Sequence, residues 1–159
     1  MVKTGVTEQS KLIFLDVDGV LNSTKFAIKM LEEDNVRIYA EDMLDPHALR
    51  LLKRLVDETG ALLILSSSWR KIPESRRNLE RQLEQYGMYI AGSTPCTYGK
   101  RGDDITAWFN MIPAARKCRY VILDDDSDMT VHMKHLVQTR FDTGLTRESV
   151  DKAIEILMG

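Results

Sequence analysis

The sequence predicts an α/β fold: a single Rossmann-like domain with three layers, in which helices cover both faces of a mostly parallel, five-stranded sheet. Short apolar runs alternate along the chain with amphipathic stretches of helical periodicity, as in proteins built from successive strand–helix units. Several apolar runs stop abruptly at acidic residues or serine, which is typical of buried parallel strands that end at a sheet edge. Residues 1–159 fit one domain, because a chain of this length can bury one large core.

The individual elements follow from these patterns. The apolar runs predict five strands, at residues 12–15, 61–65, 88–91, 120–123 and 136–137. Asp45 is placed to cap a helix that begins with Pro46 and ends at Gly60, and leucines recur inside it at helical spacing. Further helices are predicted at residues 74–86, at 103–111 and after Thr146.

Composition and charge limit the compartments and binding partners to be expected. Two cysteines are too few for a disulfide framework, and the first residues lack the layout of a secretory signal. No apolar run has the length of a membrane span, so we expect a cytoplasmic protein that does not contact a membrane. The net charge of −2 argues against a polyanion-binding surface over the whole molecule. Pairs of basic residues leave room for a local basic face, at 70–71, 76–77 and 100–101.

Chemically capable residues follow three of the predicted strands. Asp16 and Asp18 follow the first strand, Ser66 follows the second, and Asp124 and Asp125 follow the fourth. Right-handed crossovers bring the carboxyl ends of parallel strands to one edge of the sheet, where ligands bind in such folds. The sequence therefore predicts a site at this edge.

The first of these segments is Asp16-Val17-Asp18-Gly19-Val20-Leu21-Asn22. A glycine turn can present two carboxylates that stand two residues apart. One carboxylate can attack a phosphorus atom while the other handles the proton of the leaving group. A calcium-binding EF-hand fits poorly, because Val20 and Ala27 stand where that loop needs ligands. Gly19 and Asn22 are expected to contact the substrate.

Phosphate ligands are predicted after the second strand and before the third helix. Ser66 and Ser67 can donate hydroxyl and backbone groups to a phosphate, and Arg70 can grip it with two parallel bonds. A cation at Lys100 or Arg101 can hold a negatively charged nucleophile and phosphate together. Arg101 is the preferred candidate because it directly precedes the glycine that opens the helix.

The densest acidic cluster follows the fourth strand. Its carboxylates repel one another and need a cation, and hard oxygen ligands beside phosphate chemistry indicate Mg²⁺. Zinc is excluded because no cysteine or third histidine completes a recognisable spacing with His132 and His135. The cluster comprises Asp124, Asp125, Asp126 and Asp128.

In this order the segments resemble the four motifs of the haloacid dehalogenase (HAD) superfamily of phosphatases. The motif residues are Asp16 with Asp18, then Ser66, then Arg101 or Lys100, and finally Asp124-Asp125 with Asp128 behind. The stretches FLDVDGVLN, LSSSWR, RGDDI and VILDDD are similar to the HAD domains of RNA-repair (Swiss Army Knife) proteins. One departure is the third motif, where the family usually has lysine and arginine offers a planar fork instead of a point charge.

The resemblance implies a mechanism with a covalent intermediate. Asp16 attacks the phosphoryl group and becomes an aspartyl-phosphate, while Asp18 protonates the leaving oxygen and then activates the hydrolytic water. The Asp16 carboxylate, the Asp18 backbone carbonyl and Asp124 or Asp125 hold Mg²⁺.

The resemblance also bears on the substrate. Many members carry a cap domain over the site, but the spaces here hold at most a small insertion or flap at 23–44. An open site suits a large substrate such as the phosphorylated end of RNA or DNA. A basic rim for a phosphate backbone is expected from Arg70, Lys71, Arg76 and Arg77.

Three alternatives stay open. A nucleotide or another small phosphomonoester is a rival substrate for the same chemistry. A phosphorylated signalling receiver is a different class with a similar sheet, but it carries its acceptor aspartate after the third strand. The third alternative is a non-catalytic HAD-like module that binds nucleic acid or protein. Oligomeric state and partner proteins are not predicted by the sequence.

Overall fold

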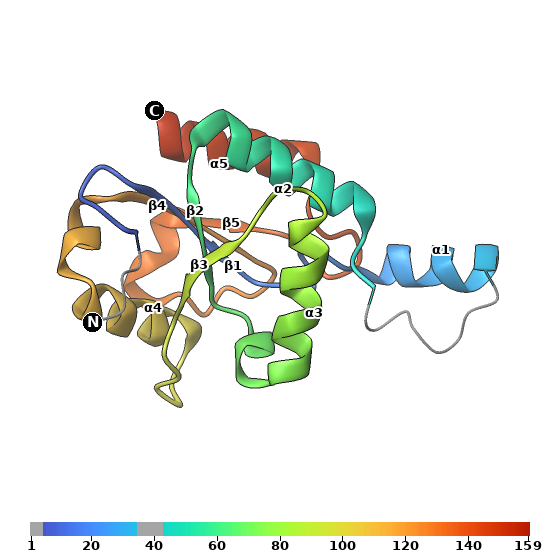
Figure 1. Cartoon of the computed structure of the whole chain (residues 1–159), viewed down its shortest axis with the longest axis horizontal. Coiled ribbons are helices and arrows are strands. Elements are labelled where there is room, and N and C mark those ends of the chain that lie inside the picture. Colours follow the sequence, from blue (N-terminus) through green and yellow to red (C-terminus); the bar gives the residue numbers. More distant parts are fainter. Residues whose placement is uncertain (1–4, 35–42) are drawn as a thin grey trace.

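The computed structural model describes residues 5–34 and 43–159 and contains a five-stranded sheet. All four strand pairs are parallel, in the order β3-β2-β1-β4-β5. The predicted α/β fold is confirmed, and the described sheet is wholly rather than mostly parallel (Figure 1). The strands are β1 Lys11–Leu15, β2 Leu62–Leu65, β3 Ile90–Ser93, β4 Arg119–Asp124 and β5 Leu136–Gln138.

Helices lie on both faces of this sheet. The α-helices are α1 Thr24–Asp34, α2 Pro46–Thr59, α3 Pro73–Glu84, α4 Arg101–Met111 and α5 Arg147–Met158. Three short 3₁₀ helices complete the described elements: η1 Ser68–Lys71, η2 Pro113–Lys117 and η3 Thr130–His135. In Figure 1, α2 and α5 run side by side over one face, and α4 lies across the other. No helix in the described part of the chain combines the length and apolar character that a membrane span requires.

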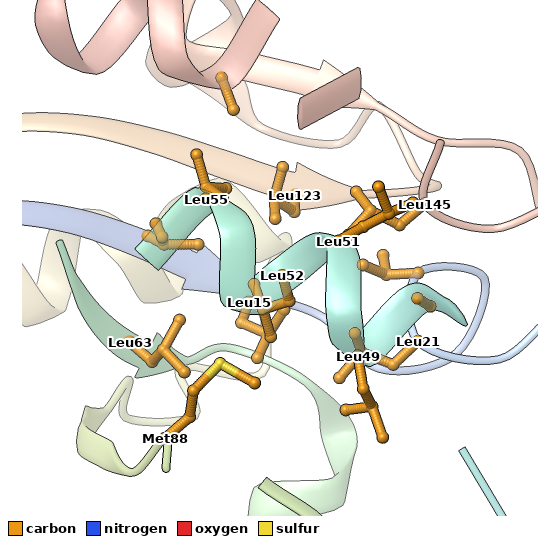
Figure 2. Packing of buried hydrophobic residues seen from close by; sticks show 14 of the residues in the cluster. Leu15, Leu21, Leu49, Leu51, Leu52, Leu55, Leu63, Met88, Leu123 and Leu145 are labelled. Atoms are coloured by element: carbon orange, nitrogen blue, oxygen red, sulfur yellow. The ribbon is translucent and has the colours of Figure 1, made fainter. Parts of the chain in front are cut away.

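Alternation of side chains along the strands produces the two apolar layers. Leu15 and Leu123 point to the face covered by α2, α3 and α5, where they pack with Leu52 (Figure 2). Phe14, one residue before Leu15, points to the opposite face and packs edge-on against Trp108 of α4. Successive side chains of a strand face opposite sides, so a fully apolar strand requires cover on both.

The predicted boundaries of α2 are confirmed by its caps. The Asp45 carboxylate accepts a hydrogen bond from the His47 backbone N–H at 2.9 Å, and Pro46 is the first helical residue. Gly60 ends the helix in the left-handed conformation with φ of 68°, where a side chain would be strained. At the last helix, the Thr146 hydroxyl accepts from the Ser149 N–H as expected.

Several predicted boundaries are displaced by one or two residues, and the starts of β3 and α4 have a clear cause. The third strand begins at Ile90 rather than at residue 88, because the Met88 N–H still bonds the Leu83 carbonyl of α3 at 3.0 Å. Helix α4 begins at Arg101 rather than at Asp103. The Asp103 carboxylate accepts from the Lys100 N–H at 2.9 Å, so it caps the first turn from inside the helix.

The proposed flap at 23–44 lies only partly within the described residues. Its first part forms α1, which projects away from the sheet (Figure 1), and residues 35–42 lie outside the described part of the chain. Between β2 and α4, the described residues form η1, α3 and β3, and no cap domain is inserted there.

Candidate active site

The carboxyl ends of the central strands meet, as the sequence predicts. Beyond β1, the Asp16 N–H bonds the Leu123 carbonyl at 3.0 Å, and beyond β2 the Ser66 N–H bonds the Leu15 carbonyl at 3.0 Å. The backbone ladder therefore continues one residue past these strands. It holds Asp16 and Ser66 at the edge where β4 ends in Asp124.

Three carboxylates and one guanidinium gather at this edge. Oxygen atoms of Asp16, Asp124 and Asp125 all lie within 4.8 Å of one another. The Arg101 Nη1 atom lies 3.2 Å from Asp16 Oδ1 and 2.8 Å from Asp124 Oδ2. Because Arg101 opens α4, this contact attaches the helix to the ends of β1 and β4.

The cluster is mostly buried, and its carboxylates outnumber its one guanidinium. Asp16 is 5 % exposed and Asp124 only 1 %. Burial raises the pKa of Asp124 to about 8; the neighbouring Asp16 adds to this rise and Arg101 opposes it. Burial likewise raises the pKa of Asp16, again against the effect of Arg101. One guanidinium does not neutralise three close carboxylates, so a further cation suits the cluster.

The donor set indicates which kind of cation fits. All three side chains offer carboxylate oxygens, which are the ligands of hard divalent cations. Asp128, also predicted as a metal residue, contacts the start of α4: its carboxylate accepts from the Arg101 N–H at 3.2 Å, and its carbonyl accepts from the Gly102 N–H at 3.0 Å. Asp128 therefore holds the first turn of α4 and lies outside the group of three close carboxylates, so its role as a metal ligand stays a prediction.

Glycines permit two close approaches in this region. Gly19 has φ of 79°, and a Cβ atom there would lie 2.7 Å from the Asp125 carboxylate. A Cβ atom at Gly102 would collide with the Met129 backbone oxygen. Gly19 thus permits the close approach of Asp125, and its predicted substrate contact stays a prediction. Gly102 lets α4 approach the loop after β4 closely enough to bring Arg101 to the cluster.

Asp18 is held on both of its oxygens. Oδ1 accepts from Asn22 Nδ2 at 2.8 Å, and Oδ2 accepts from the indole N–H of Trp69 at 3.1 Å. The Asn22 Oδ1 atom accepts from the Gly19 N–H at 2.9 Å, so this amide braces the turn instead of standing free for a substrate. Sequence reasoning missed Trp69, because nothing in the sequence indicates which carboxylate an indole 51 residues away will reach.

The two serines after β2 differ in their contacts. Ser66 is fully buried, and its Oγ has no hydrogen-bond partner among the described residues. Such an unmet hydroxyl is costly unless a ligand completes it, which is compatible with the predicted phosphate contact. The Ser67 Oγ instead accepts from the Trp69 N–H at 3.2 Å and caps η1.

The Arg70 guanidinium is surrounded by acceptors of the protein itself. Its side chain is 6 % exposed, and Nη2 lies 2.8 Å from the Asp104 carboxylate. Its other donors reach the backbone carbonyls of Ser66, Ser67, Thr94 and Pro95. These acceptors occupy the guanidinium and connect the loops after β2 and β3, so the contacts shown here favour a structural role over the predicted phosphate clamp.

Of the two candidate cations before Gly102, the structure brings only one to the cluster. Arg101 bonds Asp16 and Asp124, whereas the Lys100 side chain is exposed at the N-cap position of α4. The position of Arg101 therefore agrees with its choice over Lys100 as the candidate cation.

Comparison with known proteins agrees with this arrangement. The family described as the HAD domain in Swiss Army Knife RNA repair proteins matches residues 12–150. The chain belongs to this family. The HAD match runs from β1 into α5 and so includes every residue of the cluster. Membership supports hydrolase activity in general terms.

Two other comparisons add little. No curated protein matches the chain. A haloacid dehalogenase-like hydrolase from Streptococcus pneumoniae aligns over 92 % of this chain and 91 % of its own, with a TM-score of 0.45 and 12 % identity. Such a distant likeness does not refine the assignment.

The structural role of Arg70 in this HAD domain can be tested by measuring the free energy of unfolding. Replacing Arg70 with Met leaves Asp104 without its ion-pair partner, and removal of one member of a shielded pair costs about 3–5 kcal/mol. We expect the free energy of unfolding in urea to fall by that order, whereas Arg77→Met on the exposed face of α3 leaves it within about 0.5 kcal/mol. Equal stability of both variants would restore Arg70 as a candidate phosphate ligand.

The carboxylate cluster predicts a pH-dependent stability in EDTA. An Asp124 pKa of about 8 in the folded protein, against 3.8 in the unfolded chain, means that the folded state binds the extra proton between these values. Stability should therefore fall as pH rises from about 4 to about 8 and then level off. Thermal unfolding should show this slope in the wild type and a smaller one in Asp124→Asn. Added Mg²⁺ should raise the melting temperature most at the alkaline end of this range. If stability depended on pH equally in the wild type and in Asp124→Asn, Asp124 would not be the group responsible.

Proposed function

We propose that this HAD domain is a Mg²⁺-dependent phosphomonoester hydrolase that removes a terminal phosphate from a nucleic acid through an aspartyl-phosphate. The observation that carries the proposal is the geometry of Asp16. This carboxylate is buried at a strand end and paired with Arg101 at 3.2 Å, and a second carboxylate, Asp18, follows two residues later in a fixed orientation.

The residues support a two-step reaction. The Asp16 carboxylate attacks phosphorus and forms an acyl-phosphate bond, while the bond to the leaving oxygen breaks and Asp18 donates its proton to that oxygen. Asp18, now ionised, takes a proton from water, whose oxygen attacks phosphorus and releases phosphate and free Asp16. The hydrogen bonds from Asn22 and Trp69 keep Asp18 oriented through this exchange.

Arg101 and the carboxylate cluster supply the charge for this chemistry. The guanidinium brings a positive charge to the nucleophile and to incoming phosphoryl oxygens, and it stays protonated at every working pH. Asp16, Asp124 and Asp125 would hold Mg²⁺, which when bound neutralises charge on the transferring phosphoryl group. The buried Ser66 hydroxyl is placed to complete its hydrogen bonding with a phosphoryl oxygen.

Two features support a nucleic-acid substrate. The family is described from RNA repair proteins, and the described residues form no cap over the strand ends. The predicted basic rim is only partly available, because Arg70 is engaged and Arg76 pairs with Glu80 at 2.8 Å. Exposed basic side chains remain on η1 and α3, at Lys71, Arg77 and Arg81.

Phosphate release from a substrate panel tests the proposal. We expect release from 5′- and 3′-mononucleotides and from end-phosphorylated oligonucleotides with Mg²⁺ but not with EDTA, fastest on an oligonucleotide end. Asp16→Asn should lower kcat at least about a thousandfold, as loss of a nucleophile does in covalent hydrolases. The control Asp57→Asn makes the same change on the exposed side of α2 and should leave kcat unchanged.

The outcomes separate the alternatives. An Asp16→Asn variant that kept about a tenth of wild-type kcat would sink the nucleophile assignment. Faster turnover of mononucleotides than of oligonucleotides would make the protein a nucleotidase. Release from none of the substrates would favour the non-catalytic binding module.

The choice between the two cations is tested with the same assay. Arg101→Met should lower kcat/KM about a hundredfold or more, since it removes a charged donor from the site. Lys100→Met changes an exposed neighbour of similar length and should stay within about threefold of the wild type. Reversal of this order would assign the third motif to Lys100.

A further inference from the structure

A pocket adjoins the candidate general acid Asp18, and no residue of the carboxylate cluster lines it. It has a volume of about 270 Å³, and its lining includes Asp18, Asn22, Phe26 and Phe141. Phe26, from α1, is 7 % exposed and belongs to the protein interior. Phe141, from the loop between β5 and α5, also lines the pocket and is 57 % exposed.

The loop that carries Phe141 is fastened to the catalytic turn at both ends. Before Phe141, the Thr139 hydroxyl donates to the Gly19 carbonyl at 2.6 Å. After it, the Leu145 N–H donates to the Val20 carbonyl at 2.9 Å. These bonds connect the loop to the two residues that follow Asp18, so the position of the ring is coupled to the turn that presents the acid.

Further bonds hold the loop between these ends. The Phe141 carbonyl accepts from the Thr24 N–H at 3.2 Å, and the Asp142 carbonyl accepts from the Lys25 N–H at 3.0 Å. The first turn of α1 is thereby capped by the loop. Arg140 and Asp142, on either side of Phe141, form two parallel bonds of 3.0 Å. An exposed aromatic ring on such a constrained backbone has already lost much of the freedom that ligand binding would otherwise remove.

We propose that Phe141 is the stacking platform for a nucleobase in the leaving group of the substrate. The inference rests on the proposed function: if Asp18 protonates the leaving oxygen, the leaving group starts at Asp18, and the pocket that Asp18 lines is its first available space. A flat aromatic base suits an exposed aromatic residue whose backbone is held in place. Stacking also tolerates any base, because every base has a π face.

The test compares substrates that differ only in the base. The kcat/KM for a nucleoside 5′-monophosphate is divided by that for ribose 5-phosphate, and end-phosphorylated oligonucleotides are assayed in parallel. Base–aromatic stacking corresponds to roughly a ten- to hundredfold change, so Phe141→Ala should lower this ratio by about tenfold or more, and Phe141→Tyr should preserve it. Tyr89→Ala is the matched control, because Tyr89 is an exposed aromatic at the opposite end of the sheet, just before β3.

Three results would overturn the platform. One is an equal loss on both members of the substrate pair in Phe141→Ala. Another is the same change in ratio in Tyr89→Ala. The third is a phosphotyrosine peptide that is hydrolysed faster than any nucleotide and depends on Phe141, which would give the pocket to an aromatic side chain of a protein.

A binding measurement separates failure of this inference from failure of the proposed function. Calorimetry compares nucleoside 5′-monophosphate and ribose 5-phosphate on wild type and Phe141→Ala. If no substrate releases phosphate, the hydrolase proposal fails, yet tighter nucleotide binding that Phe141→Ala abolishes would still support the platform. Equal affinity for both compounds in the wild type would overturn it.

Discussion

The Arg101 guanidinium contacts Asp16 and Asp124 together, and through them it connects β1, β4 and the first turn of α4. A buried carboxylate is costly without a partner, and two such groups side by side are costlier. Arg101 offsets part of that cost for both at once. Because Asp125 adds a third negative charge nearby, the pairing remains incomplete, and a further cation suits the cluster.

The neighbouring elements keep this contact in place. Asp128 holds the N-terminal turn of α4 from the loop after β4, and Gly102 allows the two backbones to meet. On the other side, Arg70 collects the carbonyls of the loops after β2 and β3 and pairs with Asp104 of α4. Two arginines therefore organise the sheet edge in different ways: Arg101 pairs with the carboxylates at the strand ends, and Arg70 connects the loops that surround them.

Much of the fold and the acidic centre could be predicted from local pattern. Apolar runs that stop at Asp16 and Asp124 mark strand ends, and parallel topology brings such ends together. The partners of polar side chains could not be predicted in this way. The sequence predicts Arg70 as an anion ligand, but in the folded chain backbone carbonyls accept most of its hydrogen bonds. Trp69 and Phe141 lie on segments whose positions depend on tertiary contacts.

The central place of β1 in a parallel sheet has a consequence for how the protein is made. Leu12 pairs with Leu62 on one side and with Tyr120 on the other, so the second ladder closes a much longer loop than the first. Loops of that length close late, and synthesis from the N-terminus delays β4 further. In a ribosome-bound chain, β1 can thus pair with β2 before Asp124 has joined Asp16 at the sheet edge. The cluster of Asp16, Asp124 and Asp125 is therefore complete only after most of the domain has been synthesised, so any activity that needs all three carboxylates arises late in synthesis.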